Sequence, residues 1–184
     1  MRIITGRFKG KKLVAPKESD TSIRPTLDRI KEPVFSMLMP YLNEAKVLDL
    51  FAGTGALGLE AISRGASYAI LNDKSTEALR IISANVTLTQ AQNCVKISRK
   101  EYDKCLKSLK GEKFDIIFLD PPYATNYERD ALEKIVEHEL LSQDGIIILE
   151  TDKRKEINEE INGLEMKDKR TYGRVTIRVY KWKE

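Results

Sequence analysis

The fold is decided by the stretch Val47-Leu48-Asp49-Leu50-Phe51-Ala52-Gly53-Thr54-Gly55-Ala56-Leu57-Gly58. An apolar run of strand length leads into a turn that contains three glycines, and a run of helix length follows. Because glycine has no Cβ, a ligand can approach the backbone of such a turn closely. Ligands of open α/β sheets bind outside the carboxyl ends of the strands, so we expect a ligand at this turn.

Short apolar runs alternate with longer amphipathic segments on the carboxyl side of this stretch. This alternation predicts a mostly parallel sheet with helices on both of its faces. The apolar runs cover residues 47–50, 68–71, 95–97, 114–119 and 146–150, and the amphipathic segments cover 56–64, 76–89, 102–109 and 130–140. Two further strand-like runs, 165–171 and 174–182, flank Tyr172-Gly173 and predict an antiparallel hairpin at one sheet edge. The expected sheet therefore has seven strands.

The amino-terminal part has a different pattern. Runs 2–5 and 11–14 flank Gly6 and Gly10, which predicts a small basic β-hairpin. A helix is expected to begin after Thr26, with Pro33 causing a kink or dividing it into two pieces near Glu32. We accordingly expect a hairpin extension over residues 1–25 and one compact domain over residues 26–184.

Charge is distributed unevenly along the chain. Residues 1–31 contain nine Lys or Arg against three Asp or Glu, residues 166–184 contain seven against two, and the 184 residues together carry +4. Basic ends on an acidic body suggest that the ends meet a polyanion, although lysines also protect exposed sheet edges. The chain has no apolar run of membrane-spanning length and begins without a secretory signal, so we expect a cytoplasmic protein that makes no membrane contact. The spacing of Cys94 and Cys105 fits neither a zinc site nor a disulfide framework.

Two kinds of ligand suit the glycine turn. Gly53, Gly55 and Gly58 match the dinucleotide-binding pattern, and Asp73 follows at the distance of a residue that holds ribose hydroxyls. This pattern alone does not distinguish a nicotinamide cofactor from another nucleoside. Asp49 at the strand end favours a ligand with a cationic group, because a carboxylate there would repel a pyrophosphate. The turn also contains no basic residue that would bind phosphate.

The segment Asp120-Pro121-Pro122-Tyr123 follows the apolar run 114–119. Two successive prolines stiffen the backbone and remove two N–H donors, so this loop presents mainly hydrogen-bond acceptors. The exocyclic amine of a nucleic-acid base is a weak nucleophile, because its lone pair is delocalised into the ring. Acceptance of its N–H groups by the Asp120 carboxylate and a loop carbonyl would direct that lone pair at an electrophile. Tyr123 offers a ring on which the base can stack.

These segments resemble a known enzyme class. The glycine turn combined with Asp120-Pro121-Pro122-Tyr123 is similar to the S-adenosylmethionine-dependent amino methyltransferases. When residues 6–13 and the segment Arg24-Pro25-Thr26-Leu27-Asp28-Arg29 are included, the chain resembles the bacterial family, commonly called RsmD, that methylates N2 of a guanine in 16S ribosomal RNA. The resemblance covers residues 2–180 and implies a Rossmann-like methyltransferase fold, an S-adenosylmethionine cofactor and no metal. It also implies a monomer that acts on 16S ribosomal RNA, either free or within a small-subunit assembly intermediate.

The resemblance also implies roles for individual residues. Asp49 would face the ammonium end of the cofactor, Asp73 would hold its ribose, and Glu101 and Tyr102 would meet its adenine. The methionine and ribose part would be lined by Phe51, Ala52, Gly53 and Gly55. The target amine would be held by Asp120, Pro121, Pro122 and Tyr123. RNA phosphates would be bound by Arg7, Lys9, Lys11, Lys12, Arg24 and Arg29. Relatives often carry a glutamate where this chain has Leu71, so ribose recognition rests on Asp73 or involves Asn72.

Other functions explain less of the sequence. A nicotinamide-dependent oxidoreductase would use the glycine turn and Asp73 but neither the Asp120 loop nor the basic hairpin. A non-catalytic RNA-binding module would use only the basic ends. An N6-adenine methyltransferase acting on DNA or RNA shares the Asp-Pro-Pro-Tyr loop, and it is the main alternative. A DNA enzyme of that kind would need a target-recognition insertion, for which this chain has no room.

Overall fold

The structure is a computed structural model that describes residues 1–16, 27–122 and 125–184, with residues 27–29 described by their backbone alone. The helices are α1 (Leu27–Leu38), α2 (Ala56–Ser63), α3 (Thr76–Thr89), α4 (Tyr102–Ser108) and α5 (Tyr127–Glu137), with a short 3-10 helix over Met39–Tyr41. The strands are β1 (Lys46–Asp49), β2 (Tyr68–Asn72), β3 (Val95–Ser98), β4 (Phe114–Leu119), β5 (Leu141–Asp152), β6 (Glu160–Ile161), β7 (Leu164–Tyr172) and β8 (Val175–Trp182). No described helix combines the length and apolar character needed to cross a bilayer.

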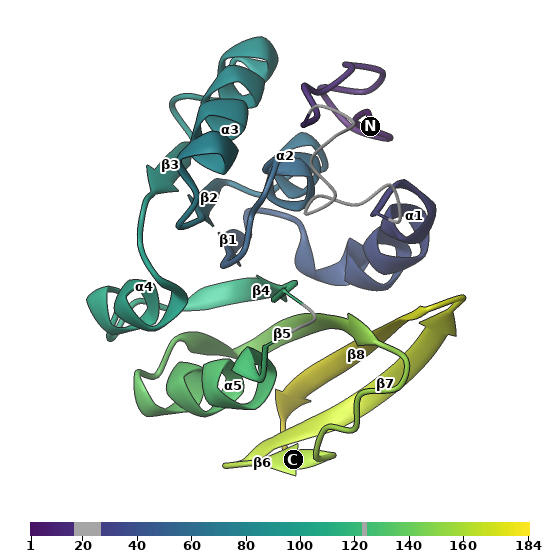
Figure 1. The fold of residues 1–184 in the computed structure, drawn as a ribbon, viewed down its shortest axis with the longest axis vertical. Helices are drawn as coiled ribbons and strands as arrows, with labels where there is room; N and C mark the ends of the chain where they lie inside the picture. Colours follow the sequence, from purple (N-terminus) through teal and green to yellow (C-terminus); the bar gives the residue numbers. More distant parts are fainter. Residues whose placement is uncertain (17–26, 123–124) are drawn as a thin grey trace.

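The strands form one sheet in the order β3-β2-β1-β4-β5-β8-β7-β6 (Figure 1). Strands β1 to β5 are parallel, whereas β8, β7 and β6 run antiparallel to their neighbours. The predicted α/β architecture with an antiparallel carboxyl-terminal hairpin is confirmed. The predicted number of seven strands is wrong by one, because the two-residue strand β6 adds to the outer edge and is too short to produce an alternating pattern.

Helices cover both faces of the sheet, and each face has its own apolar core. Along β1, Val47 points to the layer of α1, α2 and α3, whereas Leu48 points to the layer of α4 and α5. Alternate side chains of a strand face opposite sides, so a strand buried on both faces is apolar at nearly every position. This explains why the central strands appear in the sequence as uninterrupted apolar runs.

The order of the parallel strands reverses between β1 and β4. From β1 the chain adds β2 and β3 on one side, and it then returns to add β4 and β5 on the other side. Strand β1 pairs with β2 on one side and with β4 on the other, with Asp49 opposite both Leu71 and Phe118. The glycine turn after β1 and the Asp120 loop after β4 therefore leave the same sheet edge from neighbouring strands. Ligand sites of open α/β sheets lie at such switch points.

Helix α1 is continuous through Pro33, so the predicted division into two pieces near Glu32 is wrong. The proline removes one backbone hydrogen bond, a loss that the packing of the rest of the helix outweighs. Val34, Phe35 and Leu38 after the proline are all buried against the sheet. Thr26, after which the helix was expected to begin, lies outside the described residues.

The amino-terminal hairpin is held by one isolated antiparallel bridge between Arg2 and Lys12. Its apolar residues Ile3, Phe8 and Leu13 are buried in the same core as α1 and α2. The boundary predicted at residue 25 falls in the undescribed segment 17–26 and remains a prediction.

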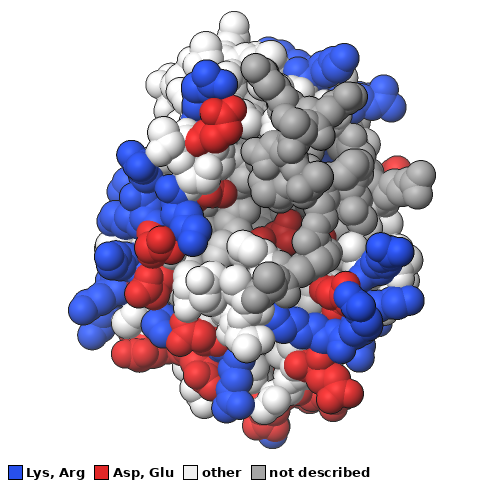
Figure 2. All heavy atoms as spheres, in the orientation of Figure 1, with Lys and Arg blue, Asp and Glu red and all other residues white. Residues whose placement is uncertain are grey.

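Basic side chains gather on two flanks of the face shown in Figure 2. One flank lies over β3 and α4, and its exposed residues are Lys96, Arg99, Lys100, Lys104 and Lys107. The other lies at the tip of the β7–β8 hairpin and the turn after β5, which are joined by a hydrogen bond of 2.8 Å from Lys153 N to Arg174 O. Its exposed residues are Lys153, Arg154, Lys169, Arg170 and Arg174. Arg154 and Arg170 are each paired with a neighbouring aspartate.

A fully buried carboxylate on α2 joins three parts of the chain. Glu60 accepts hydrogen bonds from the backbone N–H groups of Ile4 (2.9 Å) and Thr5 (3.0 Å) in the hairpin. It also pairs with Lys31 of α1 at 3.0 Å and with Arg64 at 2.8 Å. Burial by itself raises the pKa of Glu60, but these donors and cations outweigh it, so the pKa lies below its ordinary value. The charged form of Glu60 thus stabilises the folded state at neutral pH.

Replacement of this carboxylate tests its role. Glu60→Gln leaves the buried Lys31 ammonium without its counter-ion, so we expect the free energy of unfolding at pH 7 to fall by about 3–5 kcal/mol. Urea denaturation measures this loss. The matched control is Glu77→Gln, which breaks a solvent-exposed pair with Arg80 and should cost at most about 1 kcal/mol. Equal losses in the two variants would contradict the anchoring role.

Candidate functional site

The glycine turn connects β1 to α2 and uses backbone conformations that favour glycine. Gly53 (φ 57°) and Gly55 (φ 77°) are both in the left-handed region, and Gly55 forms the N-cap of α2. Gly58 is needed for a different reason, because a Cβ there would lie 2.2 Å from Leu71 Cδ2. The first two glycines shape the turn, whereas the third lets α2 pack closely on β2.

Asp49 lies beneath this turn and is 2% exposed. Its Oδ2 accepts a hydrogen bond of 3.2 Å from the N–H of Gly58. Burial raises the pKa of Asp49 to about 7, with the Gly58 hydrogen bond opposing the rise and the nearby Asp73 carboxylate adding to it. A cation bound beside Asp49 would favour its charged form, so the site is suited to a positively charged group.

Asp73, which follows β2, is fixed by the backbone on both of its carboxylate oxygens. Oδ2 accepts the N–H of Gly53 at 2.9 Å, and Oδ1 accepts the N–H of Ser75 at 2.8 Å. Each oxygen retains a lone pair for a further donor. Asp73 is therefore held in place at the glycine turn and can still accept hydroxyl groups of a ligand.

Asn72, the last residue of β2, connects the same loops. Its side-chain amide donates to the carbonyls of Leu50 (3.1 Å) and Lys100 (3.0 Å). Its buried Oδ1 has no hydrogen-bond partner within the described part of the chain. Asn72 thus links the loops after β1 and β3 by hydrogen bonds at the pocket. Its Oδ1 could accept a further hydrogen bond there.

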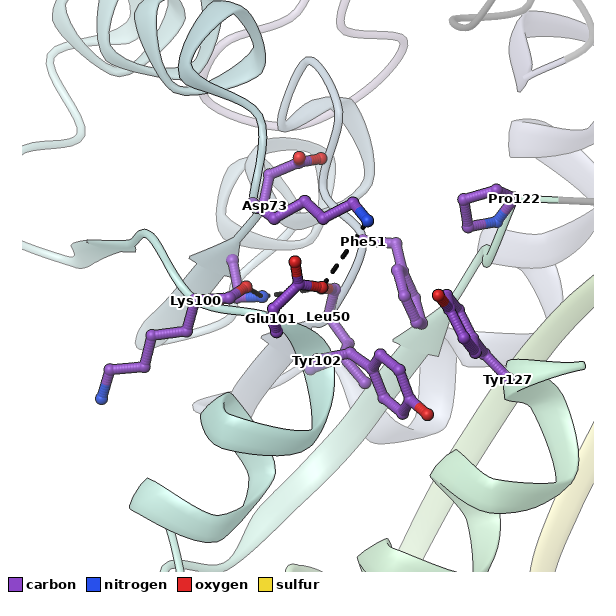
Figure 3. A pocket seen from close by; sticks show the side chains of 10 residues that line it. Leu50, Phe51, Asp73, Lys100, Glu101, Tyr102, Pro122 and Tyr127 are labelled. Carbon is purple, nitrogen blue, oxygen red and sulfur yellow. Dashed lines mark hydrogen bonds and ion pairs between the residues drawn. The ribbon is translucent and has the colours of Figure 1, made fainter. Parts of the chain in front are cut away.

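These loops enclose a pocket with about 410 Å³ of unfilled space, part of it open to solvent (Figure 3). A row of three aromatic rings forms one side, with centroids 5.7 Å apart for Phe51 and Tyr102 and 4.5 Å apart for Tyr102 and Tyr127. The hydroxyl of Tyr102 donates to Asp130 at 2.7 Å, which fixes the central ring. The pocket is lined by Leu50, Phe51, Asn72, Asp73, Lys74, Lys100, Glu101, Tyr102, Pro122 and Tyr127. Such a surface suits a flat heterocycle that stacks on the rings.

Charged side chains meet at the solvent side of this pocket. Glu101 and Lys74 form an ion pair of 3.6 Å, drawn as a dashed line in Figure 3. The two side chains are 47% and 56% exposed, so the pair is weak and either group can turn to a ligand.

The loop after β4 lies between this pocket and a second one. Pro122 lines the pocket of the aromatic rings, whereas Asp120 lines the second pocket, on the α1 face of the sheet. Pro121 between them is buried. One stiff loop thus contributes Pro122 to the first cavity and Asp120 to the second.

The predicted site residues are distributed as follows. Phe51, Asp73, Glu101, Tyr102 and Pro122 line the first pocket, while Asp49 ends β1 and Ala52, Gly53 and Gly55 belong to the glycine turn that follows it. Tyr123 and Arg24 lie outside the described residues, and the side chain of Arg29 is not among those described.

The remaining predicted RNA-binding residues belong to the amino-terminal hairpin. Arg7, Lys9 and Lys12 are exposed. Lys11 donates to the carbonyl of Leu88 at 2.7 Å. This bond fastens the hairpin to the end of α3.

Four residues that line the pocket are not among those predicted from the sequence, namely Leu50, Lys74, Lys100 and Tyr127. Lys74 follows Asp73 directly, and no pattern distinguishes it from other surface lysines. Tyr127 was missed because the helix was predicted to begin at residue 130, whereas α5 begins at Tyr127. Glu128 and Asp130 lie in its first turn, and acidic residues there are a start signal that would have placed Tyr127 correctly.

Known proteins resemble the chain over its whole length. The model of the family described as "Conserved hypothetical protein 95" matches residues 1–181. The chain is 37% identical to "Putative rRNA methyltransferase YlbH" from Bacillus subtilis, with 98% of each chain covered. It is 33% identical to "Ribosomal RNA small subunit methyltransferase D" from Haemophilus influenzae, covering 98% of this chain and 93% of the relative. The solved structure described as "Putative methyltransferase yhhF from Escherichia coli" superimposes with a TM-score of 0.88 at 27% identity, covering 100% of this chain and 98% of that one.

The raised pKa of Asp49 has a measurable consequence for stability. Because this pKa is about 7 in the folded chain and 3.8 is the ordinary value, folding takes up a proton between these pH values, and the contribution of Asp49 to stability decreases as pH rises through that range. Asp49→Asn removes this titration. Urea denaturation gives the unfolding free energy of each protein. We expect the difference between them, Asp49→Asn minus wild type, to be higher at pH 8 than at pH 4.5. A difference independent of pH would contradict the raised pKa.

Proposed function

The chain belongs to the family described as "Conserved hypothetical protein 95", and on this premise we propose that it methylates ribosomal RNA with S-adenosylmethionine as the methyl donor. The names of the relatives, which are similar over nearly the whole chain, support ribosomal RNA as the substrate class. The resemblance of the three sequence motifs supports the finer proposal that the acceptor is N2 of a guanine in 16S ribosomal RNA. The observation that carries the proposal is the position of the Asp120 loop between two pockets.

The first pocket fits the proposed cofactor. The Asp49 carboxylate, with its pKa of about 7, suits the ammonium group of the methionine part. Asp73, held by two backbone N–H groups, accepts the ribose hydroxyls. The rings of Phe51, Tyr102 and Tyr127 provide a surface for the adenine, and stacking of a base on an aromatic ring contributes about 1–3 kcal/mol. Glu101 lies at the outer side of that surface, where it can accept the adenine amino group.

The Asp120 loop supplies the chemistry of the acceptor. S-adenosylmethionine provides an electrophilic methyl group when it is bound. The Asp120 carboxylate accepts an N–H of the target amine and directs the nitrogen lone pair toward the cofactor pocket, which Pro122 of the same loop lines. Rate enhancement then comes mainly from the positioning of the two reactants. Asp120 or water takes the proton that the nitrogen loses.

The surface charge supports an RNA partner. Exposed basic residues occupy the amino-terminal hairpin and the two flanks shown in Figure 2. Contacts between such residues and phosphates supply affinity that does not depend on sequence. A base within a duplex cannot enter a pocket behind the Asp120 loop, so the target guanine is unpaired or flipped out of its stack.

The proposed reaction is tested with labelled cofactor. Wild-type protein should transfer methyl groups to under-methylated ribosomal RNA, with or without small-subunit proteins, and nucleoside analysis should identify N2-methylguanosine. N6-methyladenosine would instead support the adenine methyltransferase. Failure to methylate any RNA form would contradict the proposed function, and tight binding of a nicotinamide cofactor would favour the oxidoreductase.

The role of Asp120 is tested with an isosteric variant. Asp120→Asn removes the charge that accepts the amine hydrogens, so we expect kcat to fall by about 100-fold or more. Cofactor affinity, measured by calorimetry, should remain within about threefold. The matched control is Asp144→Asn, which changes an exposed carboxylate in the amino-terminal half of β5 and should leave both quantities unchanged. Equal activity in the two variants would contradict the assigned role.

The hairpin is tested by its salt dependence. Lys9→Ala/Lys12→Ala removes two exposed cations, so the slope of log affinity for ribosomal RNA against log salt should decrease by about two. The matched control is Lys110→Ala/Lys113→Ala, which removes two exposed cations at the amino-terminal end of β4. An equal decrease in both variants would show that RNA binding is not localised at the hairpin.

A further inference from the structure

The second pocket lies on the α1 face of the sheet and has about 260 Å³ of unfilled space, part of it open to solvent. Its walls come from α1, α2, β4, β5 and β8, and its lining is Ile30, Val34, Leu57, Phe118, Leu119, Asp120, Ile148, Glu150 and Ile177. Of these nine residues, which are the described part of the lining, seven are apolar and two are carboxylates. A mostly apolar cavity with a few convergent polar groups is typical of a pocket that orients a ring-shaped ligand.

Glu150 occupies a position of β5 at which the alternation of apolar side chains predicts an apolar residue. Ile146 and Ile148 face the α1 side, and alternation places Glu150 on that side as well. In the neighbouring strand its register partner is the apolar Ile177. Glu150 is 4% exposed, and a carboxylate buried at such a position carries a desolvation cost that an apolar residue would not have.

Asp120 and Glu150 come from adjacent strands. The parallel register pairs Phe118 with Ile148 and Leu119 with Leu149, so the next residues in each strand are Asp120 and Glu150. Neighbouring strands lie about 4.8 Å apart, and both residues line the same cavity. The pocket thus presents two carboxylates side by side above an apolar floor.

We propose that this cavity receives the target guanine and that Glu150 selects it by accepting the N1–H while Asp120 accepts the N2 amine. This inference rests on the proposed function. On guanine, N1–H and the N2 amino group are adjacent donors on one edge, which matches two adjacent carboxylates. Adenine has an acceptor at N1, which a carboxylate would repel. A site built to hydrogen-bond a donor discriminates strongly against an analogue that lacks it, because the site's buried polar group is then unpaired.

The test compares two RNAs that differ at the target base. One carries guanine, and the other carries 2-aminopurine, which keeps the 2-amino group but has no hydrogen on N1. Wild-type kcat/KM should be at least 100-fold higher for guanine. In Glu150→Gln the side-chain amide can donate to N1 of 2-aminopurine, so we expect the guanine preference to shrink at least tenfold. The matched control is Glu137→Gln, an exposed carboxylate at the end of α5, which should keep the wild-type preference.

The outcomes separate this inference from the proposed function. If the wild type methylates guanine RNA but shows no preference over 2-aminopurine, Glu150 does not read N1–H and only the inference fails. An unchanged preference in folded Glu150→Gln has the same meaning. The wild-type comparison remains decisive if the variant does not fold, which thermal melting reveals. If no guanine RNA is methylated, the proposed function fails together with the inference.

Discussion

The parallel pairing of β1 with β4 is the constraint on which the candidate site depends. It places the ends of two strands, separated by about seventy residues of sequence, next to each other at one sheet edge. The glycine turn leaves from the first strand and the Asp120 loop from the second, so the sheet itself would bring the proposed cofactor and the proposed target base together. The two successive prolines keep the second loop stiff. If the loops after β1 and β4 were flexible, ligand binding would have to order them. Here the backbone of the Asp120 loop is already stiff before any ligand binds.

The acidic and basic residues are distributed differently around this sheet edge. Carboxylates gather where the strands end, with Asp73 and Glu101 at the first pocket, Asp49 beneath the glycine turn, and Asp120 and Glu150 at the second pocket. The basic residues lie outside, on the hairpin and on the two flanks. An acidic centre is unsuited to phosphates but suits a cationic cofactor and the donor edge of a base. A polyanion that approaches the basic flanks would therefore be held by its backbone outside the site while one base enters the centre.

Sequence patterns predicted the features that depend on local rules. The boundaries of α3 and β4 agree with the structure, because a capped amphipathic run and a fully apolar run are unambiguous. Helix α1 was predicted to kink or to divide at Pro33, but it continues through the proline, because the tertiary packing of Val34, Phe35 and Leu38 outweighs the local propensity. The place of Glu150 could not be predicted, since its neighbour Asp120 lies thirty residues away in sequence and only the strand register brings them together. Helix start signals could place Tyr127 at the beginning of α5, but the contact of its ring with Tyr102 depends on the position of α5 relative to α4.

The buried Glu60 shows how the binding surfaces are kept in one arrangement. It holds the hairpin through the N–H groups of Ile4 and Thr5, and it holds α1 through Lys31. Glu60 itself belongs to α2, which begins at the glycine turn of the cofactor pocket, whereas α1 supplies Ile30 and Val34 to the wall of the second pocket. The proposed RNA-binding hairpin, the proposed base pocket and the glycine turn of the proposed cofactor site are thus joined through one carboxylate. A buried ion pair adds little net stability compared with apolar packing, but its directional bonds fix the relative positions of the groups that it connects. For an enzyme whose proposed catalysis consists mainly of positioning, that fixation is a sufficient physical reason for a charge in the core.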